Sequence, residues 1–92
     1  MRQLPTDAAV MGYILRLSDM MESLTQINLS VRFRAQLLRL AQAHALLNGQ
    51  HFVAPDDVQV MFAPAVRHRM TRVEPGARGE LTQNAIAKTE LP

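Results

Sequence analysis

The stretch that decides the fold is residues 28–49, which read NLSVRFRAQLLRLAQAHALLNG. Ser30 is suited to cap a helix that begins at the next residue, because its hydroxyl can accept a hydrogen bond from a free N–H of the first turn. Gly49 stands where a left-handed residue commonly ends a helix. The stretch therefore predicts one long helix over residues 31–48, with boundaries good to ~2–4 residues.

This predicted helix has two distinct faces. At about 100° of rotation per residue, one side collects mainly apolar residues, namely Phe33, Leu37, Leu40, Ala41, His44 and Leu47. The other side collects Arg32, Gln36, Arg39 and Ala43. The first face predicts a contribution to the core. The second would present a fixed positive edge to something negative.

The composition indicates a small folded helical domain. A chain of 92 residues fits one domain with one modest core, and 48% apolar residues favour a folded chain. Aromatic residues make up only 4%, so Leu, Ala, Val and Met must fill the core, which favours helices. The formal charge of +2 is too small to demand a nucleic-acid partner, although nine of the ten cations are Arg, the better residue for recognising phosphate.

The compartment is predicted to be the cytoplasm. The chain has no Cys, so it has neither a disulfide framework nor a thiolate metal site, which fits a reducing environment. No apolar run is long enough to span a bilayer, and we expect no membrane partner. Pro5 and Asp7 stand where a signal peptide would need an apolar block.

Apolar spacing predicts further helices on both sides of the central one. A first helix is expected over residues 7–23, with Thr6 as its cap. A third helix should start at Pro55, and Pro64 should break or kink it, dividing it from a short fourth helix around residues 65–70. We expect a loop over residues 73–79 and a weak last helix around residues 81–86. The prediction is an all-α fold, a small bundle of four to five helices forming a single domain over residues 1–92.

The sequence lacks the constellations that a catalyst of this size would need. It contains no Gly-rich phosphate loop, and Lys88 is its only lysine. The three histidines do not have metal-ligand spacing, and His44 is expected to be a core or interface residue. Asp56 and Asp57 are best explained as favourable charges at a helix start. The chain alone is therefore not expected to be an enzyme.

The arginine face is the remaining functional candidate, with Arg67 and Arg69 as a second cationic cluster. From spacing alone, a solvated helix face is the simpler explanation. Arg32, however, falls in the first turn of its helix, where a cation opposes the macrodipole and costs a little stability. A residue placed against its local preference is a reasonable functional candidate.

Residues 38–58 read LRLAQAHALLNGQHFVAPDDV, and residues 63–70 read APAVRHRM. Both resemble the C-terminal lid of MoxR-type AAA+ ATPases, and the closing residues 89–92 are similar to that family's chain end. Residues 28–33 fall on the family's Gly-Ala-Ser-Pro-Arg-Ala, so Arg32 matches the sensor-2 arginine. The chain departs from the family pattern at four positions, where it has Asn28, Val31, His44 and Ala54.

The resemblance implies a lid that closes over ATP and Mg²⁺ held by an AAA+ core of the same protein. It implies Arg32 as a catalytic and nucleotide-binding residue, and neighbouring subunits in a ring, usually a hexamer. Arg39, on the same face of the helix, is expected to bind nucleotide as well. Members of the family act as chaperone-like remodellers of partner proteins. The chain then reads as a fragment that lacks the upstream nucleotide-binding domain and is inactive alone.

Two other functions stay open on sequence grounds. A small nucleic-acid-binding module would use the Arg32/Arg39 and Arg67/Arg69 clusters, and its affinity would fall by ~10³–10⁵ between low and moderate salt. The low net charge and the scarcity of aromatic residues argue against it. A protein-interaction domain would instead present an apolar outward face rather than an arginine-bearing one.

Overall fold

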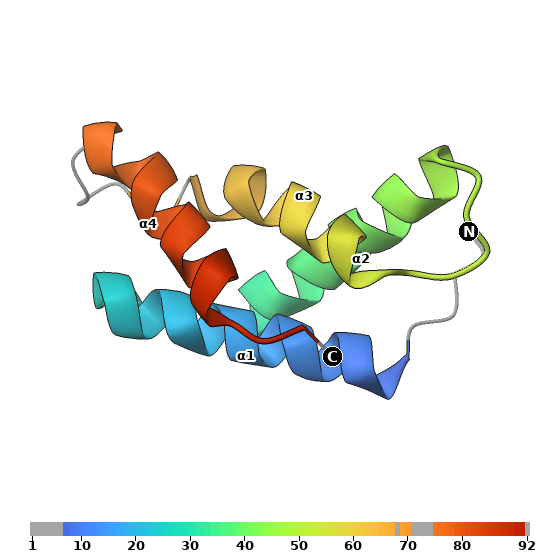
Figure 1. The fold of residues 1–92 in the computed structure, drawn as a ribbon, viewed down its shortest axis with the longest axis horizontal. Coiled ribbons are helices and arrows are strands. Elements are labelled where there is room, and N and C mark those ends of the chain that lie inside the picture. Colours follow the sequence, from blue (N-terminus) through green and yellow to red (C-terminus); the bar gives the residue numbers. More distant parts are fainter. Residues whose placement is uncertain (1–6, 68, 71–74, 92) are drawn as a thin grey trace.

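The computed structural model describes residues 7–67, 69–70 and 75–91 (Figure 1). This part of the chain forms four helices, α1 (Ala8–Thr25), α2 (Val31–Leu47), α3 (Pro55–Arg67) and α4 (Pro75–Lys88). No strand occurs among the described residues. The prediction of an all-α bundle of four to five helices is therefore confirmed.

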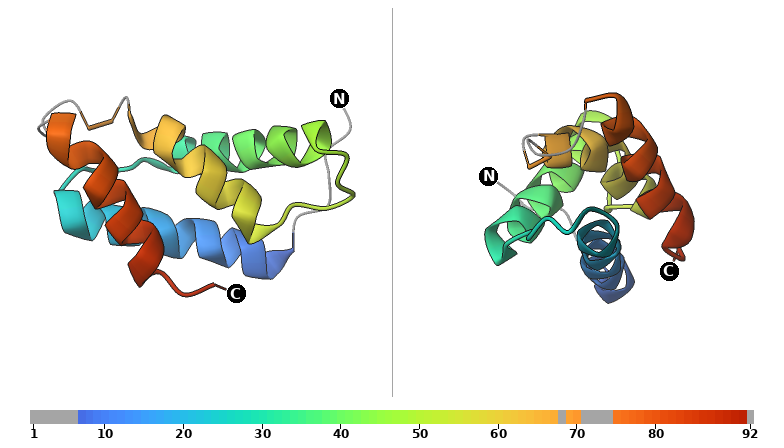
Figure 2. Two further views of the ribbon diagram at one scale, coloured as in Figure 1. Left: turned by 45° about the horizontal axis from the view of Figure 1, so that its top comes forward. Right: turned by 90° about the vertical axis from the view of Figure 1, so that its left-hand side faces the viewer.

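Two of the helices are central and two are peripheral. α1 and α3 each contact all three other helices, whereas α2 and α4 make no contact with one another within the described residues. Figure 2 shows α2 and α4 on opposite flanks of the α1–α3 pair when the bundle is viewed end-on. The most extensive contacts join α2 to α3 and α1 to α4.

The core draws side chains from every helix and from the connections between them. Phe33 of α2 and Phe62 of α3 meet at its centre, with ring centroids 6.5 Å apart and planes inclined at 73°, an edge-to-face contact. The other fully or nearly fully buried apolar residues are Val10, Tyr13, Ile14, Leu17, Met21, Leu29, Leu37, Ala41, Ala45, Val53, Val58, Val66, Met70 and Ala85. Burial of this surface is the main force that holds four short helices together.

Both predicted ends of α2 are confirmed. The Ser30 hydroxyl accepts a hydrogen bond from the N–H of Phe33 at 3.2 Å, and Gly49 has a left-handed φ of 71°. The predicted apolar face is only partly right, because Leu40 is 36% exposed and Leu47 is 87% exposed. The buried seam instead follows steps of four, through Phe33, Leu37, Ala41 and Ala45. Such a row is inclined to the helix axis, so Leu40 and Leu47 turn away from α3.

The start of α1 differs from the prediction. Asp7 is its cap and accepts a hydrogen bond from the N–H of Ala9 at 3.0 Å. Thr6, the predicted cap, lies outside the described residues. The helix also continues two residues beyond the predicted end at residue 23, where Gln26 closes it with a left-handed φ of 61°.

The prediction that Pro64 divides the third helix is wrong. Pro64 lies inside α3, and residues 65–67 belong to that helix rather than to a separate one. Proline removes one backbone hydrogen bond. Phe62 and Val66, on either side of it, are fully buried, and their packing keeps the helix continuous.

The prediction of a loop over residues 73–79 is wrong where the structure describes it. α4 begins at Pro75 and includes Gly76 and Gly79. Proline suits a first helical position, since the missing N–H would have had no partner there. Packing of α4 against α1 then outweighs the poor helix propensity of the two glycines. No helix in the described part of the chain is both long and apolar enough to cross a membrane.

A candidate nucleotide-facing edge on helix α2

Arg32 and Arg39 lie on one exposed stripe of α2, as the sequence predicts. They are seven positions apart, close to two helical turns, so they point in nearly the same direction. Both are exposed, and neither makes a hydrogen bond or ion pair with another described residue. Val31, beside Arg32, is 82% exposed. The first turn of α2 therefore presents a guanidinium to which no described group of the domain is bound.

The first turn itself is held firmly in place. Ser30 caps it, and Phe33 is 1% exposed within the core. The guanidinium carbon of Arg69 lies 5.8 Å from the centre of the Phe33 ring, in cation–π range. Of the second cationic cluster predicted from the sequence, Arg69 thus packs on a core ring, whereas Arg67 is exposed at the end of α3.

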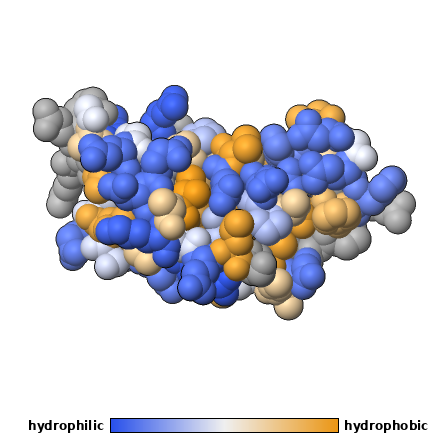
Figure 3. Space-filling view, viewed as in Figure 1, coloured by the Kyte–Doolittle hydropathy of each residue, from blue (hydrophilic) through white to orange (hydrophobic). Residues whose placement is uncertain are grey.

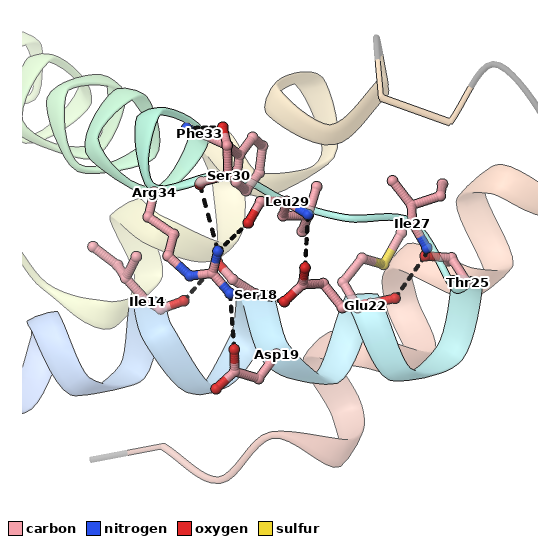
Figure 4. Close-up of polar contacts among 11 residues, drawn as sticks. Ile14, Ser18, Asp19, Glu22, Thr25, Ile27, Leu29, Ser30, Phe33 and Arg34 are labelled. Carbon is pink, nitrogen blue, oxygen red and sulfur yellow. Dashed lines mark hydrogen bonds and ion pairs between the residues drawn. The ribbon is translucent and has the colours of Figure 1, made fainter.

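A second arginine ties the start of α2 to α1 (Figure 4). Arg34 Nη2 donates to Asp19 Oδ1 at 2.8 Å and to Glu22 Oε1 at 2.9 Å. Its Nη1 donates to the carbonyls of Leu29 and Ser30. Glu22 Oε2 in turn accepts the N–H of Leu29 at 2.7 Å. We call Arg34, Asp19, Glu22 and Leu29 the Arg34 clamp.

The charges of the Arg34 clamp reinforce one another. The pKa of Glu22 is lowered, first by the hydrogen bond from the Leu29 N–H and then by the one from Arg34. Partial burial alone would lower the pKa of Arg34, but its hydrogen bonds to Glu22 and Asp19 outweigh that effect and raise it. Glu22 and Arg34 therefore each favour their charged form.

The far end of α2 is joined to α3 through a buried carboxylate. His44 Nδ1 lies 2.6 Å from Asp57 Oδ1. Asp57 Oδ2 accepts hydrogen bonds from Gln50 Nε2 at 2.9 Å and from the Ala54 N–H at 2.8 Å, and the side chain is only 2% exposed. Burial would raise the pKa of Asp57, but the hydrogen bonds from Ala54, His44 and Gln50 lower it. His44, expected to be a core or interface residue, lies at the contact between α2 and α3.

Asp57 does more than the helix-dipole role predicted for it. Ala54 precedes the first residue of α3, so Asp57 is the third helical residue and its carboxylate reaches back to the capping residue's N–H. This is one half of a capping box. The geometry compensates for Ala54, which has no side-chain oxygen and cannot supply the other half.

Sequence reasoning missed the Arg34 clamp. A signal was present, since Asp19 and Glu22 are three apart and so share one face of a helix. Arg34 also lies about 200° around the helix from Arg32, on the side that faces the bundle. No periodicity in a single helix shows that these two faces meet.

Arg32 and Arg39, which we call the arginine edge, line neither of two open cavities in the described part of the chain. One, of about 500 Å³, lies between α1 and the end of α4 and is lined by Arg16, Asp19, Met20, Ser23, Lys88, Thr89 and Glu90. The other, of about 280 Å³, is lined by Ala63, Arg67, Met70, Arg78, Gly79 and Thr82. No group of three potential metal ligands occurs in the described part of the chain. Figure 3 shows one face covered largely by polar side chains with separate apolar spots.

The chain is thus a small helical domain in which Arg32 and Arg39 form an exposed cationic edge on α2. A family model described as the AAA lid domain matches residues 21–89, and the chain belongs to this family. It is thus the helical lid of an AAA+ ATPase, and membership implies that it works beside an AAA+ core within an oligomeric ring. No curated protein and no solved structure matches the chain.

Proposed function

We propose that this lid belongs to a MoxR-type AAA+ ATPase and closes over ATP, with Arg32 as its sensor-2 arginine. One observation carries the proposal. In a domain of the AAA lid family, the first turn of α2 holds an exposed arginine that is bound to no described residue of the domain. The resemblance of residues 28–33 to the sensor-2 motif supports the same assignment.

Arg32 has the chemistry that phosphoryl transfer requires. A guanidinium offers several N–H donors in a rigid fork and can bind two phosphate oxygens at once. Placed beside the transferring phosphoryl group, it would stabilise the charge that develops there. Mg²⁺, held by the AAA+ core, would neutralise charge on the same phosphates.

Arg39 would contribute less than Arg32. At about 1.5 Å of rise per residue, it lies roughly 10 Å farther along α2. A nucleotide whose terminal phosphates reach Arg32 would meet Arg39 only at its periphery. We assign Arg39 a supporting role in nucleotide binding and no part in the chemical step.

The wider role follows from the MoxR resemblance of residues 38–58. The lid would move relative to the core as nucleotide is bound and hydrolysed, which would transmit the nucleotide state to neighbouring subunits of a ring, usually a hexamer. The assembly would remodel partner proteins in a chaperone-like manner in the cytoplasm.

Replacement of Arg32 tests the proposal in the ATPase in which this lid works. Arg32→Ala should lower kcat by ~10²–10³, because it removes a group that stabilises the transition state. Arg32→Lys should lower kcat nearly as much, since an ammonium keeps the charge and loses the fork. Steady-state ATP hydrolysis and a thermal melt should be measured for each variant.

Two further variants complete the test. Arg39→Ala should reduce turnover only slightly, and Arg16→Ala, which removes an exposed arginine of α1 distant in sequence from the site, should leave it unchanged. Normal turnover in a folded Arg32→Ala variant would make Arg32 an ordinary surface residue and refute the proposed mechanism.

A further inference from the structure

Three consecutive side chains at the start of α2 have three different surroundings. Arg32 is exposed, Phe33 is buried in the core, and Arg34 is held in the Arg34 clamp. Residues two apart on a helix point about 200° from one another. Arg34 therefore binds α1 on nearly the opposite side of α2 from Arg32.

The Arg34 clamp fixes the backbone that leads into this turn. It binds Leu29 at both of its backbone groups, since Glu22 accepts the N–H and Arg34 donates to the carbonyl. Arg34 also lies 3.4 Å from the carbonyl of Ser30, through Nη1. The first helical residue is Val31, whose φ is freer than that of a proline at the same position. Val31 does not fix the backbone at the start of α2 as a proline would. The Arg34 clamp fixes it instead, through the backbone groups of Leu29 and Ser30.

We infer that Arg34 is a positioning residue for ATP hydrolysis, which sets the direction of Arg32 by fixing the rotation of α2 against α1. This inference rests on the proposed function of Arg32. An arginine is needed because one guanidinium reaches two carboxylates and two carbonyls at once, which a single ammonium cannot do in a fixed geometry.

The Arg34 clamp is better suited to orientation than to stability. Asp19 is 71% exposed and Glu22 is 28% exposed, and ion pairs with such access to solvent contribute little to folding. Their effect on the orientation of Arg32 can be much larger, since a displacement of ~1 Å in a catalytic group can lower the rate by ~10²-fold. Loss of Arg34 should therefore affect turnover far more than the melting temperature.

A double-mutant cycle in the assembled ATPase tests the inference. The variants are Arg34→Met, Arg32→Ala and the double substitution, with Arg16→Met as the matched control on α1. Arg34→Met should lower kcat by roughly 10- to 100-fold with little change in the KM for ATP. In the Arg32→Ala background the same change should lower kcat no further, because the group that Arg34 positions is already gone.

Two milder variants serve if Arg34→Met reduces the folded fraction. Arg34→Lys should recover part of the lost kcat. Glu22→Gln should lower kcat in the same direction by a smaller factor, because its amide oxygen can still accept the Leu29 N–H. Thermal melts of all variants separate loss of folded protein from loss of turnover.

The outcomes distinguish the inference from the proposed function. Unchanged kcat in Arg34→Met, or losses that multiply in the double variant, would overturn the positioning role while Arg32 keeps its own. Normal kcat in Arg32→Ala would overturn the proposed function, and the positioning role with it. A loss in Arg34→Met that disappears in the Arg32→Ala background supports both.

Discussion

Asp57 joins three segments of the chain through one buried carboxylate. It binds His44 of α2, Gln50 of the connection, and the backbone N–H of Ala54 at the start of α3. Removal of the negative charge would weaken all three hydrogen bonds at once, in a site where water cannot readily replace them. The ionised form of this single residue therefore strengthens the packing of α2 on α3, which the apolar core already holds together.

Asp57→Asn should lower the free energy of unfolding at pH 7 by ~2 kcal/mol, a typical value for hydrogen bonds to a charged group. It should also flatten the acid limb of the stability profile. The folded-state pKa of Asp57 is lowered, so its contribution is complete above the unfolded pKa of about 4 and is lost as the pH falls through the folded pKa. Urea denaturation between pH 2 and 7, a range chosen to span these values, measures both effects.

Asp56 provides the control for Asp57. It is exposed in the same turn of α3, so Asp56→Asn should cost less than ~1 kcal/mol through the helix dipole alone. Equal losses in the two variants would show that Asp57 acts only through the dipole. An acid limb unchanged in Asp57→Asn would assign the acid sensitivity to other carboxylates, such as Glu22, whose pKa is also lowered.

At this scale the sequence predicts the exposure of Arg32 and Arg39 but not that of Leu40 and Leu47, and it does not predict the partners of Arg34 and Asp57. The shared face of Arg32 and Arg39 follows from helical periodicity, and the structure confirms it. Arg34 binds carboxylates 12 and 15 residues upstream, and Asp57 binds a histidine 13 residues upstream. These contacts depend on how helices cross, which the periodicity of one helix does not encode.

Among the helices, two glycines have opposite roles. Gly49 ends the α2 segment with a φ of 71°, a conformation that a residue with a Cβ adopts at a cost. Gly79 lies inside α4, and a Cβ added there would meet nothing within 4 Å. Gly49 is required because its backbone adopts a left-handed conformation, whereas Gly79 has an ordinary helical role and only lowers the stability of α4.

Substitution by alanine should therefore have opposite effects at the two positions. Gly49→Ala should destabilise the domain by ~1 kcal/mol, and Gly79→Ala should stabilise it by ~0.5–1 kcal/mol. Neither added methyl group meets another atom within 4 Å, so backbone conformation alone separates the pair. Chemical denaturation of the two variants beside the parent measures the difference. A shift of the same sign in both would mean that α4 is not helical at Gly79 in solution.

Capping residues predicted the helix ends correctly, whereas residues that disfavour helices did not. Ser30 and Gly49 mark the ends of α2 correctly, because caps act through the backbone of neighbouring residues. Pro64 and Gly76 misled the prediction, since both disfavour helix in isolation yet lie within helices here. Packing of α3 and α4 against the rest of the bundle outweighs a local penalty of ~1–3 kcal/mol.

For the whole domain, the prediction concerns binding of ATP by the chain alone. The 92 residues have no Gly-rich phosphate loop, and Arg32 and Arg39 line neither of the two cavities described above. We expect circular dichroism to show an α-rich fold and calorimetry to show no ATP binding in the micromolar range. A micromolar dissociation constant would contradict the assignment of a lid, which supplies only one side of the nucleotide site.

The contact between α1 and α4 has a consequence for how the domain is made. On the ribosome, α1, α2 and α3 emerge before α4, which ends 21 residues after the last residue of α3. At about 5–20 residues per second, α4 follows roughly one to four seconds later. In the finished bundle α4 covers one side of α1. Until α4 has been synthesised, that side of α1 has no helix to cover it and faces water. The nascent domain is most exposed to aggregation in those seconds, and a pause in translation between α3 and α4 would prolong them.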